Sequence, residues 1–329
     1  MFRAFLIDQV DDLVVGSVQE LEDGVLGSQG ILIDVEFSDL NYKDAMVIKG
    51  LGRLVRTYPH VPGVDLAGIV CSTDDQRFSI GDRVIVSGWR VGELYWGGLA
   101  TKARVNPDFA LKTPSSLSSF HAMALGTAGL SAMLAIMTLI DHGLSVEDTR
   151  PVLVTGAAGG VGSIAIIALH QLGFKVAAST GRLEESSYLT ELGADFIISR
   201  SELQEPSQRP LESERFSAAI DNVGGTTLGR VLGQMVRNSS IAAVGLAGGS
   251  NFTANVMPFI LRGVNILGID SVTCPNSRRL EAWERLGELI PRSKLEALTT
   301  TRGLCDVQDL AGDLLAGKIK GRTVINVNS

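Results

Sequence analysis

The chain has 329 residues, of which 45% are hydrophobic, 20% charged and 5% aromatic. This composition excludes a disordered chain, a collagen-like repeat and a disulfide scaffold. At roughly 100 to 200 residues per domain, the length predicts two domains that each bury a core. The formal net charge of −7 argues against nucleic acid as a partner, because phosphate-binding surfaces are usually basic.

The cysteines and the N-terminus indicate a cytoplasmic protein. Cys71, Cys274 and Cys305 lie far apart in the sequence, so neither a disulfide nor a structural zinc cluster is expected. Residues 1–12 lack the cationic start and apolar stretch of a signal peptide. Residues 120–140 are nearly long and apolar enough to span a membrane, but a GTAG segment interrupts them. We therefore expect a helix from about Leu130, buried in a soluble core, and no membrane partner.

The chain up to about residue 120 has the pattern of a small, mostly β domain with one or two helical insertions. Three segments have strand composition, at residues 31–37, 67–71 and 83–87. Turn-forming residues separate these segments.

Beyond residue 120, apolar strands alternate with helices. The expected strands lie at residues 152–155, 175–179, 196–199, 218–221, 240–245 and 264–269. The expected helices lie at residues 163–172, 184–192, 227–235 and 258–262. This alternation predicts a parallel sheet covered on both faces, in a doubly wound domain. The pattern does not assign the last helix, at about 307–316, or the last strand, at 323–327, to either domain.

The strongest local signal is a glycine-rich loop between an apolar strand and an apolar helix, at residues 152–163 (VLVTGAAGGVGS). From residue 157 it reads A-x-G-x-x-G, a dinucleotide fingerprint whose first glycine is replaced by alanine. Gly159 would let the backbone approach a pyrophosphate, and Gly162 would let the helix pack closely on the strand. The helix N-terminus would offer N–H groups to the phosphates. A tight turn without a ligand is the alternative, but the strand-loop-helix-strand context favours a cofactor.

The end of the following strand indicates NADPH rather than NADH. An NAD site usually presents Asp or Glu roughly 20 residues after the glycines, where it binds the ribose 2′-hydroxyl. This chain has Thr180, Gly181 and Arg182 there. A carboxylate would repel a 2′-phosphate, whereas Thr180 and Arg182 could bind it through charge-assisted hydrogen bonds. Arg200 is either a second phosphate ligand or a solvated loop arginine.

Several blocks together resemble the medium-chain dehydrogenase/reductase superfamily, in its zinc-free, quinone-oxidoreductase-like branch. They lie at residues 40–44 (LNYKD), 62–68 (PGVDLAG), 81–84 (GDRV), 126–129 (GTAG), 221–225 (DNVGG) and in the glycine loop. Finer blocks resemble the bacterial NADPH-dependent acrylyl-CoA reductases, at residues 88–89, 96–100, 245–249, 256–262, 268–272 and 321–323. The resemblance implies an α/β fold with two domains and a homodimer. Residues 1–123 and about 292–329 would form a GroES-like catalytic domain, and residues 124–291 a Rossmann NADPH-binding domain.

No metal site is expected. Zinc-dependent members of the superfamily place cysteine near residue 42 and Gly-His-Glu at the position of residues 63–65, and they often add a four-cysteine lobe. This chain has Tyr42 and Val64 at the ligand positions, and neither acts as a zinc ligand in practice.

The resemblance implies the NADPH-dependent reduction of an α,β-unsaturated acyl-CoA, namely acryloyl-CoA to propanoyl-CoA. A hydride would go to the β-carbon and a proton to the α-carbon, with hydrogen-bond donors rather than a metal stabilising the enolate oxygen. Tyr42 is the catalytic candidate, although it could instead bind the nicotinamide ribose or a phosphate. Lys43 and Asp44 could orient Tyr42 or form a structural ion pair.

The resemblance also implies further ligand contacts. Thr127 would lie near the nicotinamide carboxamide. The pyrophosphate would be covered by Gly160, Val161, Gly162, Ser163, Ile164 and Ala165. The nicotinamide half would be lined by Asn222, Leu246, Ile260 and Ser271, of which the last three could equally be core positions. The phosphates of coenzyme A suggest a cationic rim from Lys49, Arg53 and Arg56, unless these residues only solvate a loop.

Two other functions stay open. The chain could reduce a quinone or a free enone with NADPH, or it could bind NADPH without catalysis.

Overall fold

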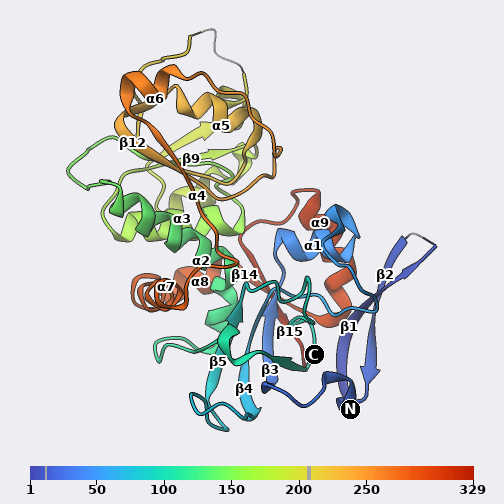
Figure 1. The fold of residues 1–329 in the computed structure, drawn as a ribbon. Coiled ribbons are helices and arrows are strands. Elements are labelled where there is room, and N and C mark those ends of the chain that lie inside the picture. Colours follow the sequence, from blue (N-terminus) through green and yellow to red (C-terminus); the bar gives the residue numbers. More distant parts are fainter. Residues whose placement is uncertain (12, 206–208) are drawn as a thin grey trace. The chain divides into compact units, whose positions relative to one another are not determined.

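The computed structural model describes residues 1–11, 13–205 and 209–329. The chain divides into two compact units (Figure 1). Unit 1 contains Met1–Thr127 and Arg292–Ser329, and unit 2 contains Ala128–Pro291. The last helix and strand, which the sequence pattern left unassigned, therefore belong to unit 1.

Unit 1 is a β domain whose main sheet has the strand order β14-β15-β3-β4-β5-β7, with β6 also paired to β3. These strands are β3 (Ile31–Asp39), β4 (Asp65–Ser72), β5 (Arg83–Ser87), β6 (Lys102–Val105), β7 (Ala110–Lys112), β14 (Thr299–Gly303) and β15 (Arg322–Asn326). The hairpin of β1 (Phe2–Val10) and β2 (Leu13–Leu21) forms a second sheet. The helices of this unit are α1 (Tyr42–Ile48), α8 (Arg292–Ala297) and α9 (Val307–Leu315).

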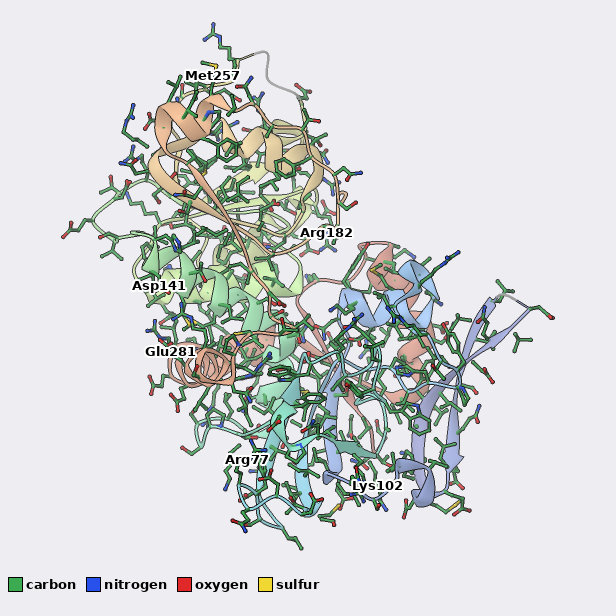
Figure 2. The ribbon with its side chains drawn as sticks, viewed as in Figure 1. Arg77, Lys102, Asp141, Arg182, Met257 and Glu281 are labelled. Carbon is green, nitrogen blue, oxygen red and sulfur yellow. The ribbon has the colours of Figure 1, made fainter. Side chains whose placement is uncertain are left out.

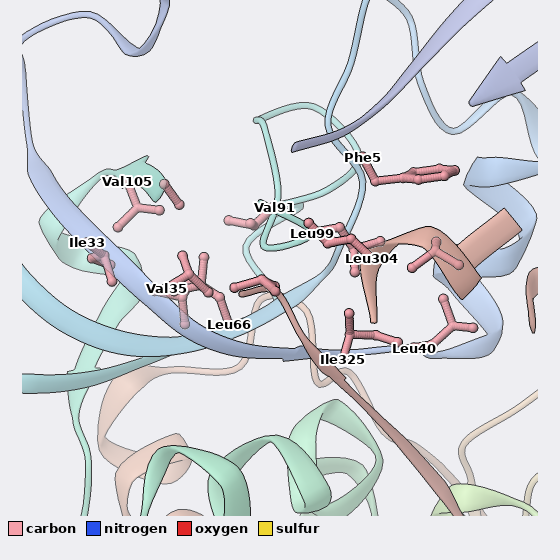
Figure 3. Packing of buried hydrophobic residues seen from close by; sticks show 14 of the residues in the cluster. Phe5, Ile33, Val35, Leu40, Leu66, Val91, Leu99, Val105, Leu304 and Ile325 are labelled. Atoms are coloured by element: carbon pink, nitrogen blue, oxygen red, sulfur yellow. The ribbon is translucent and has the colours of Figure 1, made fainter. Parts of the chain in front are cut away.

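The core of unit 1 joins residues from both ends of the chain (Figure 3). Ile33 and Val35 of β3 are buried and alternate with less buried residues, so one face of this strand packs inward. Ile325 of β15 packs in the same cluster. β15 pairs antiparallel with β3, with Ile325 opposite Ser38, so the C-terminal strand lies inside the sheet of the N-terminal strands.

Unit 2 is a doubly wound α/β domain. In the described part of the chain its sheet has the order β10-β9-β8-β11-β12-β13, and each neighbouring pair is parallel. The strands are β8 (Val152–Val154), β9 (Val176–Thr180), β10 (Phe196–Ser199), β11 (Phe216–Asp221), β12 (Met235–Ala243) and β13 (Asn265–Gly268). In the order of the chain this is 3-2-1-4-5-6, the arrangement of a Rossmann fold.

The helices of unit 2 cover both faces of this sheet. They include α3 (Gly160–Gln171), α4 (Ser186–Leu192), α5 (Gly225–Leu232), α6 (Met257–Arg262) and α7 (Asn276–Leu289). Figure 1 shows α5 and α6 on one face and α3 and α4 on the other. Because helices cover both faces, β8 and β9 are buried along their whole length. The strand order reverses at β8, and in such sheets ligands bind at the carboxyl edge beside this point.

The long helix α2 (Ser119–Asp141) begins in unit 1 and ends in unit 2. The sequence predicts that this helix begins at about Leu130, after the glycines. In the structure Gly126 lies inside the helix, where it forms a kink with φ 52° and ψ −158°, and the helix begins at Ser119. The helix is long and apolar enough to cross a membrane. However, 83% of its most apolar window is buried, as in the core helix of a soluble protein.

Candidate cofactor and active site

The glycine loop leads directly into the first turn of α3. Gly159 is the N-cap, and the Ser163 N–H donates to the Gly159 carbonyl oxygen at 2.9 Å. The N–H groups of Gly160, Val161 and Gly162 occupy the first turn, where a helix leaves donors without intrahelical acceptors. A Cβ at Gly162 would lie 2.5 Å from the Gly156 carbonyl oxygen, so the loop and helix can pack this closely only with glycine there. These N–H groups and the positive end of the helix dipole suit a pyrophosphate.

The next residues of α3 face the interior of unit 2. Ser163, Ile164 and Ala165 are fully buried. The Ser163 hydroxyl accepts a hydrogen bond from the Tyr188 hydroxyl at 2.8 Å. Their side chains therefore pack into unit 2, so a contact between these residues and a pyrophosphate would involve their backbone.

Thr180, Arg182 and Arg200 come together at the carboxyl edge of the sheet. Thr180 ends β9, and its hydroxyl accepts the Arg182 backbone N–H at 3.0 Å. Ser199, which ends β10, pairs with Thr180, and this register brings Arg200 beside Gly181. A Cβ at Gly181 would lie 2.5 Å from the Arg200 guanidinium carbon, so the missing side chain makes room for Arg200. Figure 2 labels Arg182 on this part of unit 2.

Asp221, at the end of β11, and its neighbour Asn222 both form hydrogen bonds with Thr155, which directly follows β8. The Thr155 hydroxyl donates to Asp221 Oδ1 at 2.6 Å, and the Gly224 N–H donates to Oδ2 at 2.8 Å. Burial raises the pKa of Asp221, whereas these hydrogen bonds lower it. Asn222 Nδ2 donates to the Thr155 carbonyl oxygen at 2.7 Å. Within the described structure, Asn222 Oδ1 is buried without a hydrogen-bond partner and so offers an acceptor to a ligand.

Leu246 and Ser271 also follow strands at this edge. Leu246 lies just beyond β12, where the Gly245 N–H donates to the Asp221 carbonyl oxygen at 3.1 Å. Ser271 lies beyond β13 and accepts a hydrogen bond from the Ser131 hydroxyl at 2.9 Å.

Ile260 does not lie at the carboxyl edge of the sheet with the other cofactor candidates of unit 2. It lies on α6 and is 69% exposed. Arg262, at the end of α6, donates to the carbonyl oxygens of Gly233 and Met235, which are at the amino end of β12. In Figure 2, Met257 of α6 lies well apart from Arg182. The structure therefore places Ile260 at the opposite edge of the sheet from the other cofactor candidates of unit 2.

In unit 1, Tyr42 is the first residue of α1, and its side chain is 41% exposed. Asn41 and Asp44 form a capping box, in which the Asn41 N–H donates to Asp44 Oδ2 at 2.8 Å. The other oxygen of Asp44 accepts the Val64 N–H at 2.8 Å. Asp44 thus fixes the start of the helix that carries Tyr42.

Lys43 forms an ion pair that the sequence did not specify. Its ammonium lies 3.0 Å from Glu93, whose side chain is only 5% exposed. Arg90 lies 3.6 Å from the same carboxylate. The sequence left open whether Lys43 orients Tyr42 or forms a structural ion pair. The structure shows the ion pair.

A buried polar cluster joins Asp39, Asn41, Asp65, Thr127 and Arg322. Arg322 contacts Asp39 through its guanidinium and donates to Asn41 Oδ1 at 3.1 Å. Asn41 Nδ2 donates to Asp39 at 2.7 Å and to Asp65 at 2.9 Å. Thr127 donates to Asp65 through both its N–H and its hydroxyl. Asp65 and Arg322 both lie in sequence blocks that resemble the family, but the sequence alone assigns them no role, because only the fold brings them together.

Burial dominates the electrostatics around this cluster. It raises the pKa of Asp39 well above its usual range, and the charge of Asp65 raises it further, while Arg322 lowers it. Burial also raises the pKa of Asp44 to about 7, while the backbone donors at Asn41 and Val64 lower it.

The three cations proposed for coenzyme A have different surroundings. The Lys49 ammonium donates to the Gln308 carbonyl oxygen of α9 at 2.9 Å, which gives this residue a structural role. Arg53 and Arg56 are exposed in the segment after α1. Among the described residues, no group of three or more His, Cys, Asp or Glu side chains could hold a metal ion.

A GroES-like β unit combined with a Rossmann unit defines a two-domain dehydrogenase or reductase. Residues 27–115 match the alcohol dehydrogenase GroES-like domain, and residues 160–289 match the zinc-binding dehydrogenase family. The acrylyl-CoA reductase AcuI of Ruegeria pomeroyi is 50% identical over 331 residues, covering 100% of both chains.

Solved structures agree with this assignment. The yhdH oxidoreductase of Salmonella enterica, in complex with NADP, is 45% identical over 99% of both chains, with a TM-score of 0.96. The yhfP protein of Bacillus subtilis, with NAD bound, is 39% identical over 99% of both chains, with a TM-score of 0.95. The chain belongs to the medium-chain dehydrogenase/reductase superfamily, in the quinone-oxidoreductase-like branch that includes AcuI and YhdH.

Proposed function

We propose that this protein reduces an α,β-unsaturated acyl-CoA with NADPH, converting acryloyl-CoA to propanoyl-CoA. The observation that carries the proposal is the full-length 50% identity to the acrylyl-CoA reductase of Ruegeria pomeroyi. In this proposal unit 2 is the NADPH-binding domain, and unit 1 is the catalytic domain.

The residues at the carboxyl edge of unit 2 fit NADPH. Gly160, Val161 and Gly162 would hold the pyrophosphate through their N–H groups. Thr180, Arg182 and Arg200 would bind the 2′-phosphate, whose negative charge two guanidinium groups match. Asn222, Leu246 and Ser271 would line the nicotinamide half, with Asn222 Oδ1 accepting a hydrogen bond.

The reaction needs a hydride for the β-carbon, a hydrogen-bond donor for the substrate oxygen and a proton for the α-carbon, which comes ultimately from solvent water. Bound NADPH supplies a hydride to the β-carbon. We assign the hydrogen bond to the developing enolate oxygen to Tyr42, whose phenol hydroxyl can donate to it. The capping box at Asn41 and Asp44 fixes the backbone of Tyr42 and thereby positions its ring. The alternative role of Tyr42 is to bind the nicotinamide ribose or a phosphate, and Thr127 would meet the carboxamide.

A substrate comparison tests the proposal. Purified protein is mixed with NADPH and, separately, acryloyl-CoA, acrylate or a quinone, and the absorbance of NADPH is followed. We expect rapid oxidation with the thioester alone. Absence of turnover with the thioester would overturn the proposal.

Quinone or enone reduction is the second candidate. The supporting observation is that the Bacillus subtilis relative, 39% identical over 328 residues, carries a provisional quinone-oxidoreductase name. Turnover of the quinone but not of the thioester would favour this candidate. Tight NADPH binding without turnover of any enone would instead favour a non-catalytic NADPH-binding protein.

We also propose a cytoplasmic homodimer. The three cysteines are free thiols, which persist in a reducing compartment. In the sheet of unit 2, β13 is an edge strand, and Val256, Ile260 and Leu261 are large exposed apolar residues close to it in the chain. A second copy that covers this edge would bury these side chains and pair the open strand.

A further inference from the structure

Thr127, directly after the kink of α2, gives both of its donors to a single carboxylate. Its backbone N–H donates to Asp65 Oδ2 at 2.7 Å, and its hydroxyl donates to Asp65 Oδ1 at 2.6 Å. Asn41 Nδ2 also donates to Oδ2, at 2.9 Å. Asp65 is fully buried, and its carboxylate accepts these three hydrogen bonds.

The hydroxyl of Thr127 is consequently an acceptor toward any ligand. A hydroxyl has one proton and two lone pairs. Because the proton points at Asp65, only lone pairs remain for another partner. Thr127 is partly exposed, so a ligand can reach it. Such a ligand must bring an N–H or O–H donor.

We propose that Asp65 is a positioning residue that makes Thr127 select the amide N–H₂ of the nicotinamide carboxamide. The inference rests on the proposed function, in which Thr127 meets this group. A carboxamide carries a donor and an acceptor at similar positions, so a freely rotating hydroxyl would accept either orientation. An acceptor-only hydroxyl admits only the N–H₂ side and thereby fixes the orientation of the carboxamide.

The surrounding cluster keeps Asp65 in this position. Asn41 links Asp65 to Asp39, and Arg322 contacts both Asn41 and Asp39. At Gly126, φ is 52°, and a Cβ would lie 3.0 Å from Asp65 Oδ2 and 2.7 Å from the Arg322 guanidinium. A side chain at residue 126 would therefore displace the groups that hold Thr127 and Asp65 together.

The Asp65→Asn variant should invert the hydrogen bond. The Oδ2 position receives two N–H donors, so the amide oxygen of asparagine should take that place. The amide N–H₂ would then face the Thr127 hydroxyl and donate to it. The hydroxyl proton would turn outward, which makes Thr127 a donor toward the ligand.

The experiment compares two cofactors by their dissociation constants, measured by fluorescence titration without acyl substrate. One is NADPH, and the other is its reduced 3-acetylpyridine analogue, which keeps the carbonyl but lacks the N–H donors. For one hydrogen bond, the wild-type protein should prefer NADPH by about 2- to 10-fold. Asp65→Asn and Thr127→Val should both reduce this preference to about one, whereas Thr127→Ser should retain it. Asp309→Asn, an exposed acid on α9, is the matched control and should match the wild type.

The wild-type preference in a folded Asp65→Asn protein would overturn the inference. If Asp65→Asn does not fold, Thr127→Val decides, and an unchanged preference in that variant overturns the inference as well. Because binding is measured without acyl-CoA, a failure of the proposed reaction can be distinguished from a failure of the inference about Asp65 and Thr127. In that case both cofactors still bind with the expected preference, and only turnover with acryloyl-CoA is absent.

Discussion

The guanidinium of Arg322, at the start of β15, lies against the carboxylate of Asp39, at the end of β3, although 283 positions separate them in the chain. Both side chains are buried. Arg322 also donates to the carbonyl oxygens of Met123 and Ala124, just before the kink of α2. One cation therefore holds three segments of unit 1 together.

Replacing Arg322 by methionine should strongly destabilise the protein. The variant removes the cation that contacts the buried side chain of Asp39, and breaking a buried pair costs about 3 to 5 kcal/mol. Urea unfolding followed by circular dichroism measures this loss. Arg302→Met, at an exposed position on β14, is the control and should stay within about 0.5 kcal/mol of the wild type. Equal stability of the two variants would contradict the prediction.

Gly126→Ala should cost more than the backbone conformation alone explains. Gly126 and Gly143 both have positive φ, at 52° and 93°, but only Gly126 is crowded, because nothing lies within 4 Å of a Cβ at Gly143. We expect Gly143→Ala to lose about 1 to 2 kcal/mol from its backbone conformation. Gly126→Ala should lose more than about 4 kcal/mol or fail to fold. Similar melting temperatures of the two variants would exclude the crowding described at residue 126.

Arg200→Ala should weaken the binding of NADPH far more than that of NADH. The lost charge-assisted hydrogen bond to the 2′-phosphate corresponds to about 10- to 100-fold in affinity. NADH has no such phosphate, so its affinity should change little. Isothermal titration with both cofactors gives the ratio, and Arg182→Ala should behave alike. Arg285→Ala, an exposed arginine on α7 that pairs with Glu281, is the control, and equal losses for NADPH and NADH would show that Arg200 does not touch the phosphate.

Asp44 should make the protein less stable as the pH rises from about 4 to 7. Its pKa is raised from 3.8 to about 7 by burial, so in this range the folded state binds a proton that the unfolded state lacks. The free energy of unfolding therefore falls as the pH rises through this range. Above about pH 7 Asp44 is deprotonated in both states, so it causes no further loss of stability. Asp44→Asn should flatten this slope in urea titrations at several pH values. The Asp309→Asn control should keep the wild-type slope, and an unchanged slope in Asp44→Asn would refute the assignment.

Ile260→Asp should convert the proposed dimer to monomers. A carboxylate at this exposed apolar position would have to be buried without a partner in the interface, which is costly. Sedimentation velocity at micromolar concentration reports the change. Val146→Asp, on an exposed loop of unit 2, should keep the wild-type oligomer, and a wild-type protein that is already monomeric would remove the basis of the proposal.

Much of the fold follows from local sequence patterns. The strands at residues 83–87 and 196–199 have the expected bounds, because both are short runs rich in β-branched and apolar residues between turn-forming residues. The hairpin of β1 and β2 was not predicted, and most of β2 is exposed and mixes polar with apolar residues. The helix α7 was also missed, since its many charged residues conceal a buried stripe at Arg279, Trp283 and Leu286.

The site was only partly predictable from the sequence, because some of its residues form a contiguous motif and others come together only in the fold. The glycine loop is a contiguous motif, and the sequence identified it as a loop that leads into a helix. Arg200 lies beside Gly181 because β9 and β10 are paired. The sequence does not show this pairing, so from the sequence Arg200 could equally be a phosphate ligand or a solvated loop arginine. The cluster around Asp65 joins five residues from four separate segments of the chain. No local spacing predicts it.

The position of β15 between β14 and β3 has a consequence for biosynthesis. Unit 2 is one continuous stretch of chain, Ala128–Pro291, and a domain of this kind can fold while the ribosome is still making the rest. The sheet of unit 1 lacks an internal strand until Arg322–Asn326 emerges. We therefore expect unit 1 to stay incomplete until residues 322–326 have been made, after the whole of unit 2 has been synthesised.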